Sequence, residues 1–206
     1  MIKVQSLSKP FAQSCEDNKA VILSELQKLL SNNRYLLEIG SGTGQHAVHF
    51  AANLPHLIWQ PSELKENIAG LEMWLQEAEL ENVKTPAMLN VNQEPWPFED
   101  KFDAAFTANT IHIMSIGHVE KLFNGLSKVL NEGGVFISYG PFNYNGTFTS
   151  ESNARFDFWL KNRDPASGIR DIDELKEFSN AASIGLIDDI KMPENNRLLI
   201  WQKTPR

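Results

Sequence analysis

Three glycines lie close together in the chain, between a short apolar run and a segment with helical character. They are Gly40, Gly42 and Gly44, and the apolar run at 35–39 comes directly before them. Glycine lets a backbone turn tightly and lie against a ligand, while the first amides of the following helix face the same space. This order predicts a strand, a turn and a helix that bind a nucleotide-like ligand, because ligands of open α/β sheets bind beyond the carboxyl ends of the strands.

The strand-and-helix unit recurs along the chain. Apolar runs typical of strands lie at 35–39, 57–59, 87–91, 102–108 and 135–139. Helical spacing of apolar residues recurs at 16–31, 45–53, 64–78 and 119–130. Alternation at this spacing favours a parallel sheet with helices on both faces.

Beyond residue 139 the order of elements changes. Two helical patterns and then two apolar runs follow, at 152–161, 172–183, 186–190 and 198–202. The two apolar runs are neighbours in sequence and suit antiparallel pairing. We therefore predict one α/β domain over residues 1–206, a Rossmann-like, doubly wound, mainly parallel seven-stranded sheet with a C-terminal antiparallel hairpin.

Composition and charge narrow the class of protein. The chain has 206 residues and a formal net charge of −7 at pH 7, so we expect one domain and no nucleic-acid partner. The one cysteine cannot form an internal disulfide and no Cys/His cluster has zinc spacing, which predicts a reducing compartment and no metal. No secretion signal and no apolar run near about 18 residues is present, so we expect a cytoplasmic protein without a membrane partner. The sequence favours neither a monomer nor an oligomer.

The residue before the glycines bears on the nature of the ligand. Residues 42–47 satisfy the loose G-x-G-x-x-G/A pattern of dinucleotide-binding proteins, which keeps a nicotinamide cofactor open. Glu38 favours a cationic ligand instead, because a strand that binds a nicotinamide cofactor is usually apolar at that position. S-adenosylmethionine, with a sulfonium and an amino group, is such a ligand. Alternatively, Glu38 is a solvated carboxylate or a partner for a local backbone amide.

The string E-x-G-x-G-x-G, which begins at Glu38, resembles the first motif of class I S-adenosylmethionine-dependent methyltransferases, and the resemblance covers about residues 34–141. It implies that residues after the second strand hold the ribose, residues after the third hold the adenine, and the end of the fourth lies beside the methionine moiety. The implied cofactor-binding residues are Glu38, Gly40, Ser41, Gly42, Gly44, Ser62, Glu63, Asn90, Val91, Ala108 and Asn109. The family usually has Asp where this chain has Asn90, and an amide can still accept a hydrogen bond. In the alternative without a ligand, Ser62 caps the next helix with Glu63 in its first turn.

A second resemblance extends over nearly the whole chain, to an uncharacterised methyltransferase-like family, a domain of unknown function. Its signatures WQPS, NxIHI, YGPF, SNxxFD, GIRD and MPxNN occur here at 59–62, 109–113, 139–142, 152–157, 168–171 and 192–196. This resemblance implies the cofactor and leaves the methyl acceptor open.

Methyl transfer is an in-line displacement, so the protein must align donor and acceptor and provide a base for a hydroxyl or amine. His112 is the first candidate base, because the unperturbed pKa of imidazole, near ~6.5, suits proton removal. Alternatively, His112 hydrogen-bonds loop backbone and never contacts substrate. Tyr139, at the end of the fifth strand, either donates to the acceptor or packs as a half-buried aromatic.

The polar, glycine-containing segment 143–170 is a candidate lid or substrate-capping insertion. Its candidate substrate-binding residues are Asn153, Arg155, Asp157 and Arg170. An arginine there can clamp a carboxylate or phosphate, although Arg170 and Asp171 can instead form a structural ion pair or cap the helix that begins near Ile172.

The sequence thus predicts an S-adenosylmethionine-dependent enzyme that methylates a small-molecule acceptor without a metal. Two other functions stay open. One is a non-catalytic protein that binds S-adenosylmethionine as a sensor or partner module, and the other is an NAD-dependent oxidoreductase.

Overall fold

The computed structural model describes residues 8–205 of the chain. Residues 1–7, which hold much of the N-terminal segment in which no secretion signal is predicted, lie outside the described residues, as does Arg206. Within residues 8–205, no helix has both the length and the apolar character needed to cross a membrane.

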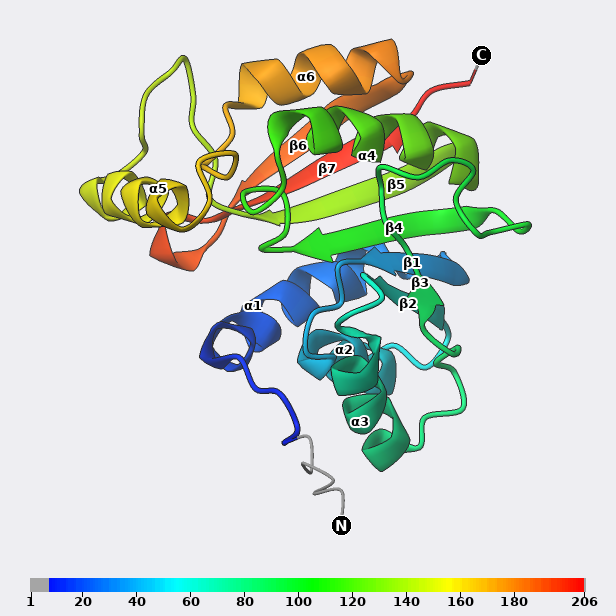
Figure 1. The fold of residues 1–206 in the computed structure, drawn as a ribbon. Coiled ribbons are helices and arrows are strands. Elements are labelled where there is room, and N and C mark those ends of the chain that lie inside the picture. Colours follow the sequence, from blue (N-terminus) through cyan, green and yellow to red (C-terminus); the bar gives the residue numbers. More distant parts are fainter. Residues whose placement is uncertain (1–7, 206) are drawn as a thin grey trace.

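The described chain forms a seven-stranded sheet with the order β3-β2-β1-β4-β5-β7-β6 (Figure 1). The strands are β1 (Tyr35–Ile39), β2 (Ile58–Glu63), β3 (Ala87–Met88), β4 (Phe102–Ala108), β5 (Leu130–Gly140), β6 (Ile184–Lys191) and β7 (Arg197–Lys203). The first five strands are parallel, and β7 pairs antiparallel with both β5 and β6. The predicted mixed sheet with a C-terminal antiparallel hairpin is confirmed.

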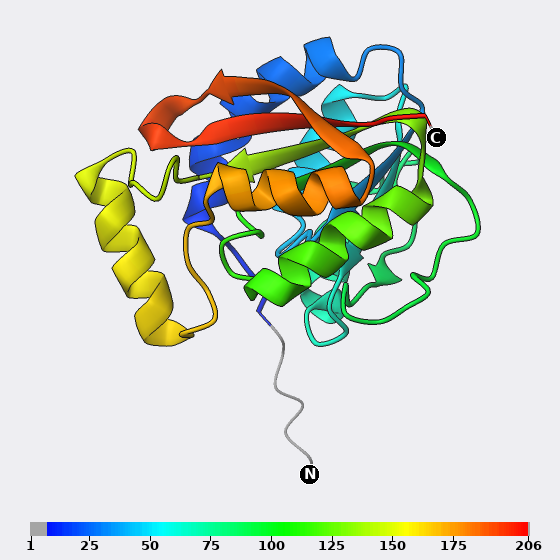
Figure 2. The same ribbon diagram turned by 90° about the horizontal axis from the view of Figure 1, so that it is seen from above.

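Helices cover both faces of this sheet. They are α1 (Gln13–Leu29), α2 (Gln45–Asn53), α3 (Ile68–Ala78), α4 (Ile116–Val129), α5 (Glu151–Arg163) and α6 (Ile172–Ala181), with a short 3-10 turn η1 (Pro193–Asn195) before β7. Helices α1, α2 and α3 lie on one side, and α4 and α6 lie on the other (Figures 1 and 2).

Alternating side chains along the strands build two separate cores. In β5, Phe136 faces α4 and α6, whereas its neighbour Ile137 faces α1 and α2. Trp201 and Trp59 are fully buried in the first and second core, respectively. Since both faces are buried, these strands lack the polar alternation of a half-exposed sheet.

Several strand boundaries differ from the sequence-based prediction, among them the end of β2, which extends to Glu63 rather than to 59, and those of β3 and β5. The third strand is only Ala87–Met88, because Asn90 turns the chain by accepting a hydrogen bond from the Asn92 amide with its side-chain Oδ1 (3.0 Å). The fifth strand begins at Leu130 rather than at 135, because Leu130 already pairs with Phe102 before an irregularity in the ladder.

The segment 143–170, called the insertion below, is closed at its base by backbone hydrogen bonds. The Asn143 amide donates to the Arg170 carbonyl and the Ile172 amide donates to the Asn143 carbonyl, both at 2.9 Å. The insertion contains α5, which stands beyond the carboxyl ends of the parallel strands and apart from both helical layers (Figures 1 and 2). The insertion therefore lies at the end of the sheet where ligands of such folds bind.

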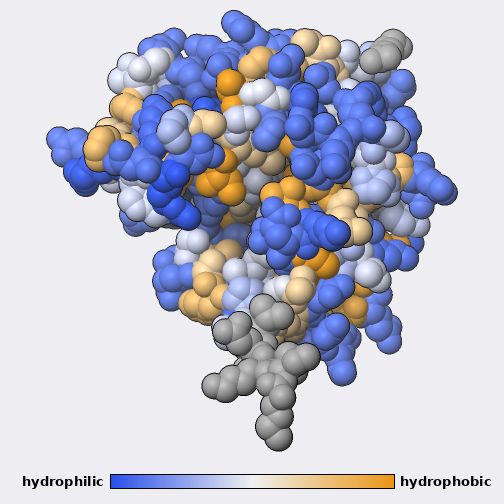
Figure 3. All heavy atoms as spheres, in the orientation of Figure 1, coloured by the Kyte–Doolittle hydropathy of each residue, from blue (hydrophilic) through white to orange (hydrophobic). Residues whose placement is uncertain are grey.

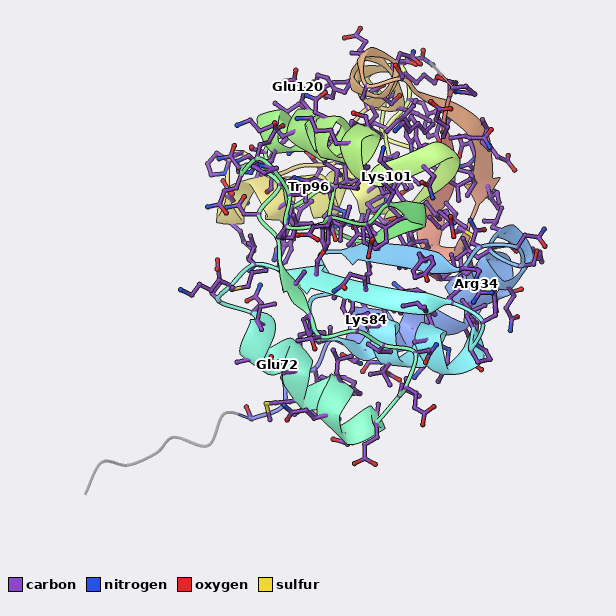
Figure 4. All side chains as sticks on the ribbon, turned by 90° about the vertical axis from the view of Figure 1, so that its right-hand side faces the viewer. Arg34, Glu72, Lys84, Trp96, Lys101 and Glu120 are labelled. Carbon is purple, nitrogen blue, oxygen red and sulfur yellow. The ribbon has the colours of Figure 1, made fainter. Side chains whose placement is uncertain are left out.

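The opposite end of the sheet carries charged side chains and one packed tryptophan. Arg34, Lys84 and Lys101 are seen there in Figure 4. Trp96 packs against α4 at Gly125, where a Cβ atom would lie 2.1 Å from the Trp96 ring. This close contact between the ring and the helix therefore requires glycine at position 125.

Candidate functional site

A cavity of about 400 Å³ lies at the carboxyl ends of β1, β2 and β4, which is within the usual range for small-molecule sites. In Figure 3 a hollow with hydrophobic atoms separates the part that contains α4–α6 from the part that contains α1–α3. The cavity is lined by Ile39, Gly40, Gly42, Glu63, Leu64, Asn67, Leu89, Asn90, Val91, Ala108, Asn109, Thr110, Ile113, Met114 and His118. Seven of the predicted cofactor-binding residues are thus brought together there.

The glycine loop, residues 40–44, forms one wall with its backbone. Gly40 has a φ of 71°, and a Cβ atom on it would lie 2.8 Å from Thr110 Cγ2. Gly42 has a φ of 56° and faces open space, with nothing within 4 Å of a Cβ position. Gly44, with a φ of 95°, caps α2 against Leu71. A ligand can therefore approach the main chain at Gly42 directly.

Glu63 at the end of β2 connects the glycine loop to the start of α3. Its Oε2 accepts from the Gly42 amide (2.7 Å), and its Oε1 accepts from the Leu64 amide (2.7 Å) and from Asn67 Nδ2 (3.2 Å). A carboxylate has about four acceptor positions, so Glu63 keeps capacity for a ligand hydroxyl.

The alternative in which Ser62 caps the next helix is wrong. Helix α3 begins at Ile68 with Asn67 as its N-cap residue, and Ser62 Oγ donates to the Glu38 carbonyl oxygen (2.6 Å). Ser62 therefore joins β2 to β1 under the glycine loop.

Glu38 lies behind the glycine loop and does not line the cavity. Its Oε2 accepts from Ser41 Oγ (2.8 Å) and from Trp59 Nε1 (3.0 Å), while Oε1 has no partner within residues 8–205. Burial raises the pKa of this carboxyl from its usual 4.5 to about 7, against the opposing effect of the two donors. Glu38 is thus neither a solvated carboxylate nor a partner of a backbone amide, the two alternatives considered for it.

Asn90 and Asn109 bring side-chain amides to two sides of the cavity. Asn90 Nδ2 has no partner within residues 8–205, and the Asn109 side chain forms no hydrogen bond there. Asn109 has a φ of 57°, and its backbone amide donates to the Tyr139 carbonyl (2.9 Å), which fixes the left-handed turn after β4. Val91 and Ala108 add apolar lining beside them.

Thr110 lines the cavity beside Asn109, as predicted, but several other lining residues were not predicted from the sequence, among them Ile113, Met114 and His118. Ile113 and Met114 belong to the connection from β4 to α4, which Ser115 ends by capping α4, and His118 lies in the first turn of α4. The position of this connection at the end of a central parallel strand is the signal that would have found them.

His112 lies at the border between the cavity and the insertion. Its carbonyl oxygen accepts from the Gly168 amide (2.8 Å), and its ring meets the Phe156 ring edge to face at 5.2 Å. Its Nδ1 and the Asn109 Oδ1 are 3.6 and 3.8 Å from where a Cβ atom of Gly140 would be. Burial, and then the nearby Arg170, lower the pKa of His112 from 6.5 to about 4, so the ring is neutral at neutral pH.

Tyr139 is 4% exposed and lies on the α1 side of the sheet, outside the cavity lining. Its hydroxyl accepts from Asn196 Nδ2 (3.0 Å). Burial raises the pKa of Tyr139 above its usual value. The phenol is therefore part of the packing between β5 and the turn before β7.

The predicted substrate-binding residues of the insertion do not line the cavity. Asp157 accepts from the Ile169 amide (2.8 Å) and forms an ion pair with Lys161 (2.7 Å). Asn153 Nδ2 donates to Thr149 Oγ1 (2.9 Å) and to the Asn195 carbonyl (3.3 Å).

The two arginines of that set differ. Arg155 is exposed and lies 3.7 Å from Glu151. Arg170 donates to the carbonyl oxygens of Met114 and Ala166 and forms no ion pair with Asp171. Asp171 caps α6 instead, by accepting from the Asp173 amide (2.9 Å). Arg170 thus ties the insertion to the cavity wall at Met114.

Histidine, cysteine and carboxylate side chains within residues 8–205 form no group of three or more that could hold a metal ion.

Residues 9–203 match the family described as "Protein of unknown function (DUF938)", and the chain belongs to this family.

Solved structures of methyltransferases share the fold. An O-methyltransferase family protein from Burkholderia thailandensis has a TM-score of 0.80 at 14% identity, covering 93% of this chain and 57% of its own. The S-adenosylmethionine-dependent methyltransferase SibL has a TM-score of 0.78 at 18% identity, and the match covers 94% of this chain and 56% of SibL. Human N-acetylserotonin methyltransferase in complex with S-adenosylmethionine has a TM-score of 0.77 at 13% identity, and the match covers 94% of this chain and 53% of the human protein. The chain therefore has the Rossmann-like methyltransferase fold and spans a little over half the length of these proteins.

Proposed function

We propose that this protein transfers a methyl group from S-adenosylmethionine to a small-molecule acceptor. The observation that carries the proposal is the cavity bounded by the glycine loop and by Glu63, at the carboxyl ends of β1 and β2. Its size suits a nucleoside-sized ligand, and the open space at Gly42 lets such a ligand contact the main chain. The methyltransferases that share the fold add support.

The residues around the cavity fit the parts of this cofactor. The remaining acceptor position of Glu63 suits a ribose hydroxyl, and Asn90 with Val91 offers an amide and an apolar surface to the adenine. Ala108 and Asn109 lie across the cavity, where they would contact the methionine moiety. Ser41, Ser62 and Gly44 would act indirectly, by fixing the glycine loop.

Glu38 provides the charge that favours a cationic cofactor. It precedes Ile39 and Gly40, which both line the cavity. Because its pKa is about 7, a positive charge in the cavity would shift Glu38 towards the carboxylate. Cofactor affinity should therefore fall as the pH drops below 7.

Bound S-adenosylmethionine supplies an electrophilic methyl group on a sulfonium. The role of the protein is to hold the acceptor atom in line with the methyl–sulfur bond and to receive a proton when the acceptor is a hydroxyl or amine. His112 is the proposed base, because its ring is neutral at neutral pH and lies beside Asn109 at the cavity border. Tyr139, held by Asn196, would position the end of β5.

A specific observation favours a second candidate, a protein that binds S-adenosylmethionine without transferring the methyl group. Since the pKa of His112 is about 4, its ring is a weak base. The alternative function, that of a nicotinamide-dependent oxidoreductase, is supported only by the glycine pattern.

The test is turnover of S-adenosylmethionine to S-adenosylhomocysteine with pools of small acceptors. We expect one pool to yield S-adenosylhomocysteine at a rate that falls about 100-fold in His112→Gln, with cofactor affinity unchanged. Cofactor binding without turnover in any pool would favour the binding protein.

A further inference from the structure

The insertion exposes large apolar side chains next to the cavity. Phe158 and Trp159 on α5 are 69% and 49% exposed, and Phe148 in the preceding loop is 39% exposed. Ile113, which lines the cavity, is 56% exposed. Single exposed apolar residues are common, but a group of them beside a cavity indicates a binding surface.

Trp159 of this group belongs to a continuous row of side chains that begins at His112. The His112 ring meets Phe156 at 5.2 Å, and Phe156 stacks on Trp159 at 5.8 Å with an interplanar angle of 17°. The Arg163 guanidinium lies 4.7 Å from the centre of the Trp159 ring. Phe156, Trp159 and Arg163 follow one face of α5, because residues three and four apart are neighbours on a helix. We call His112, Phe156, Trp159 and Arg163 the aromatic row.

The aromatic row begins at the wall of the cavity. His112 and the cavity-lining Ile113 are adjacent in the chain, and the carbonyl oxygen of His112 is held by the Gly168 amide of the insertion (2.8 Å). Arg170 holds the carbonyl oxygen of Met114, another lining residue. These two contacts hold the segment after α5 against the cavity wall, and the hydrogen bond from the Ile169 amide to Asp157 joins α5 to that segment, so a molecule stacked on the row lies next to the cavity.

Charges at the inner end of the row are already engaged. Asp157 is paired with Lys161 and with the Ile169 amide, and the Arg170 guanidinium donates to two carbonyl oxygens. The imidazole of His112 is neutral at neutral pH. The charged side chains next to the cavity are therefore held by internal contacts, and the rings are the groups left to contact a ligand, which suits an uncharged ring system.

We propose that the aromatic row is the acceptor subsite, and that the methyl acceptor is a planar aromatic molecule, uncharged at its reacting end, which stacks along Phe156 and Trp159. This inference rests on the proposed methyl transfer. Stacked aromatic pairs prefer offset or edge-to-face contacts, and a flat ligand can continue the row in this way. The side chain of Phe158 lies outside the row and supplies a matched control on the same helix.

The experiment measures binding of 2-naphthol by calorimetry, with and without saturating S-adenosylhomocysteine. The comparison ligand is decahydro-2-naphthol, which has the same carbon skeleton and hydroxyl but no planar ring. Each ligand is titrated into the wild type, Trp159→Ala and the control Phe158→Ala. Affinity for S-adenosylhomocysteine and the sedimentation coefficient are measured for all three proteins.

We expect 2-naphthol to bind about fivefold or more tightly than its saturated analogue, and Trp159→Ala to weaken it about 2- to 12-fold while Phe158→Ala changes it less than twofold. Equal binding of the two ligands, no binding of 2-naphthol, or equal effects of the two substitutions would overturn the proposal. A loss of self-association in Trp159→Ala without a change in 2-naphthol affinity would overturn it in favour of contact between copies. Failure of the proposed function is seen separately, as absent S-adenosylhomocysteine binding while 2-naphthol still binds the row.

Discussion

The two sides of the cavity hold their shape by different means. On the side of β1 and β2 the wall is main chain, and Gly40 and Gly42 adopt left-handed conformations that keep side chains out of it. On the side of the insertion, side chains fix the positions, through the contacts of Asp157 with Ile169 and of Arg170 with Met114. Changes in the glycine loop should therefore damage cofactor binding and folding together, whereas changes in the insertion should leave cofactor binding intact.

The largest effect is expected from Gly40→Ala. The new methyl group would combine a left-handed backbone with a 2.8 Å approach to Thr110, and we expect a loss of about 3 kcal/mol in the free energy of unfolding. Urea denaturation measures it. Gly133→Ala is the control, because Gly133 has a similar φ of 75° with nothing within 4 Å of a Cβ position. It should cost about 1–2 kcal/mol, and equal losses would mean that the contact with Thr110 is unimportant.

Next in size is Glu63→Ala, which removes the acceptor of the Gly42 amide and the proposed partner of the ribose. We expect the affinity for S-adenosylhomocysteine to fall about 100-fold in calorimetry, since hydrogen bonds to charged groups contribute strongly. Glu120→Ala removes the same charge from the exposed side of α4 and should change the affinity less than twofold. If the affinity for S-adenosylhomocysteine fell less than threefold in Glu63→Ala, this carboxylate would not be a partner of the ligand.

Gly40 and Glu63 belong to the side of the cavity that is predicted well from the sequence. The glycine pattern, the strand before it and Glu63 about 20 residues later are close in sequence, so their geometry follows from local rules. The contacts of the insertion join residues far apart, such as Arg170 and Met114, and a sequence gives no register for them. For this reason the residue types at Asp157 and Arg170 suggested substrate binding, while the structure engages both in internal contacts.

Glu38→Gln should act with opposite signs on stability and binding. The folded pKa of about 7 lies above the usual 4.5, so the wild type loses stability as the pH rises through this window, and the variant does not. At pH 8 the variant should be about 2 kcal/mol more stable in urea denaturation. At pH 5.5 the two should differ much less.

The same variant should bind S-adenosylmethionine more weakly at pH 8, by about tenfold, and lose the dependence of affinity on pH between 6 and 8. The histidines with lowered pKa are shared by both proteins, so they cancel in this comparison. Unchanged affinity with raised stability would make Glu38 a structural group only.

The smallest effect is expected from Tyr144→Phe at the base of the insertion. The Tyr144 hydroxyl donates to Asp189 Oδ2 (2.7 Å), and its loss should cost about 1 kcal/mol because the pair is only partly buried. Affinity for S-adenosylhomocysteine should stay within twofold of the wild type in calorimetry. A clear loss of affinity would show that the insertion and the glycine loop are coupled, which contradicts the comparison made above.

The most direct test of the central claim is a calorimetric titration of ligand-free protein with S-adenosylhomocysteine, with NADH as the control ligand. The account predicts micromolar binding of S-adenosylhomocysteine, strongly weakened in Glu63→Ala, and no comparable binding of NADH. Tighter binding of NADH, or no binding of either ligand, would contradict the assignment of this cavity to S-adenosylmethionine.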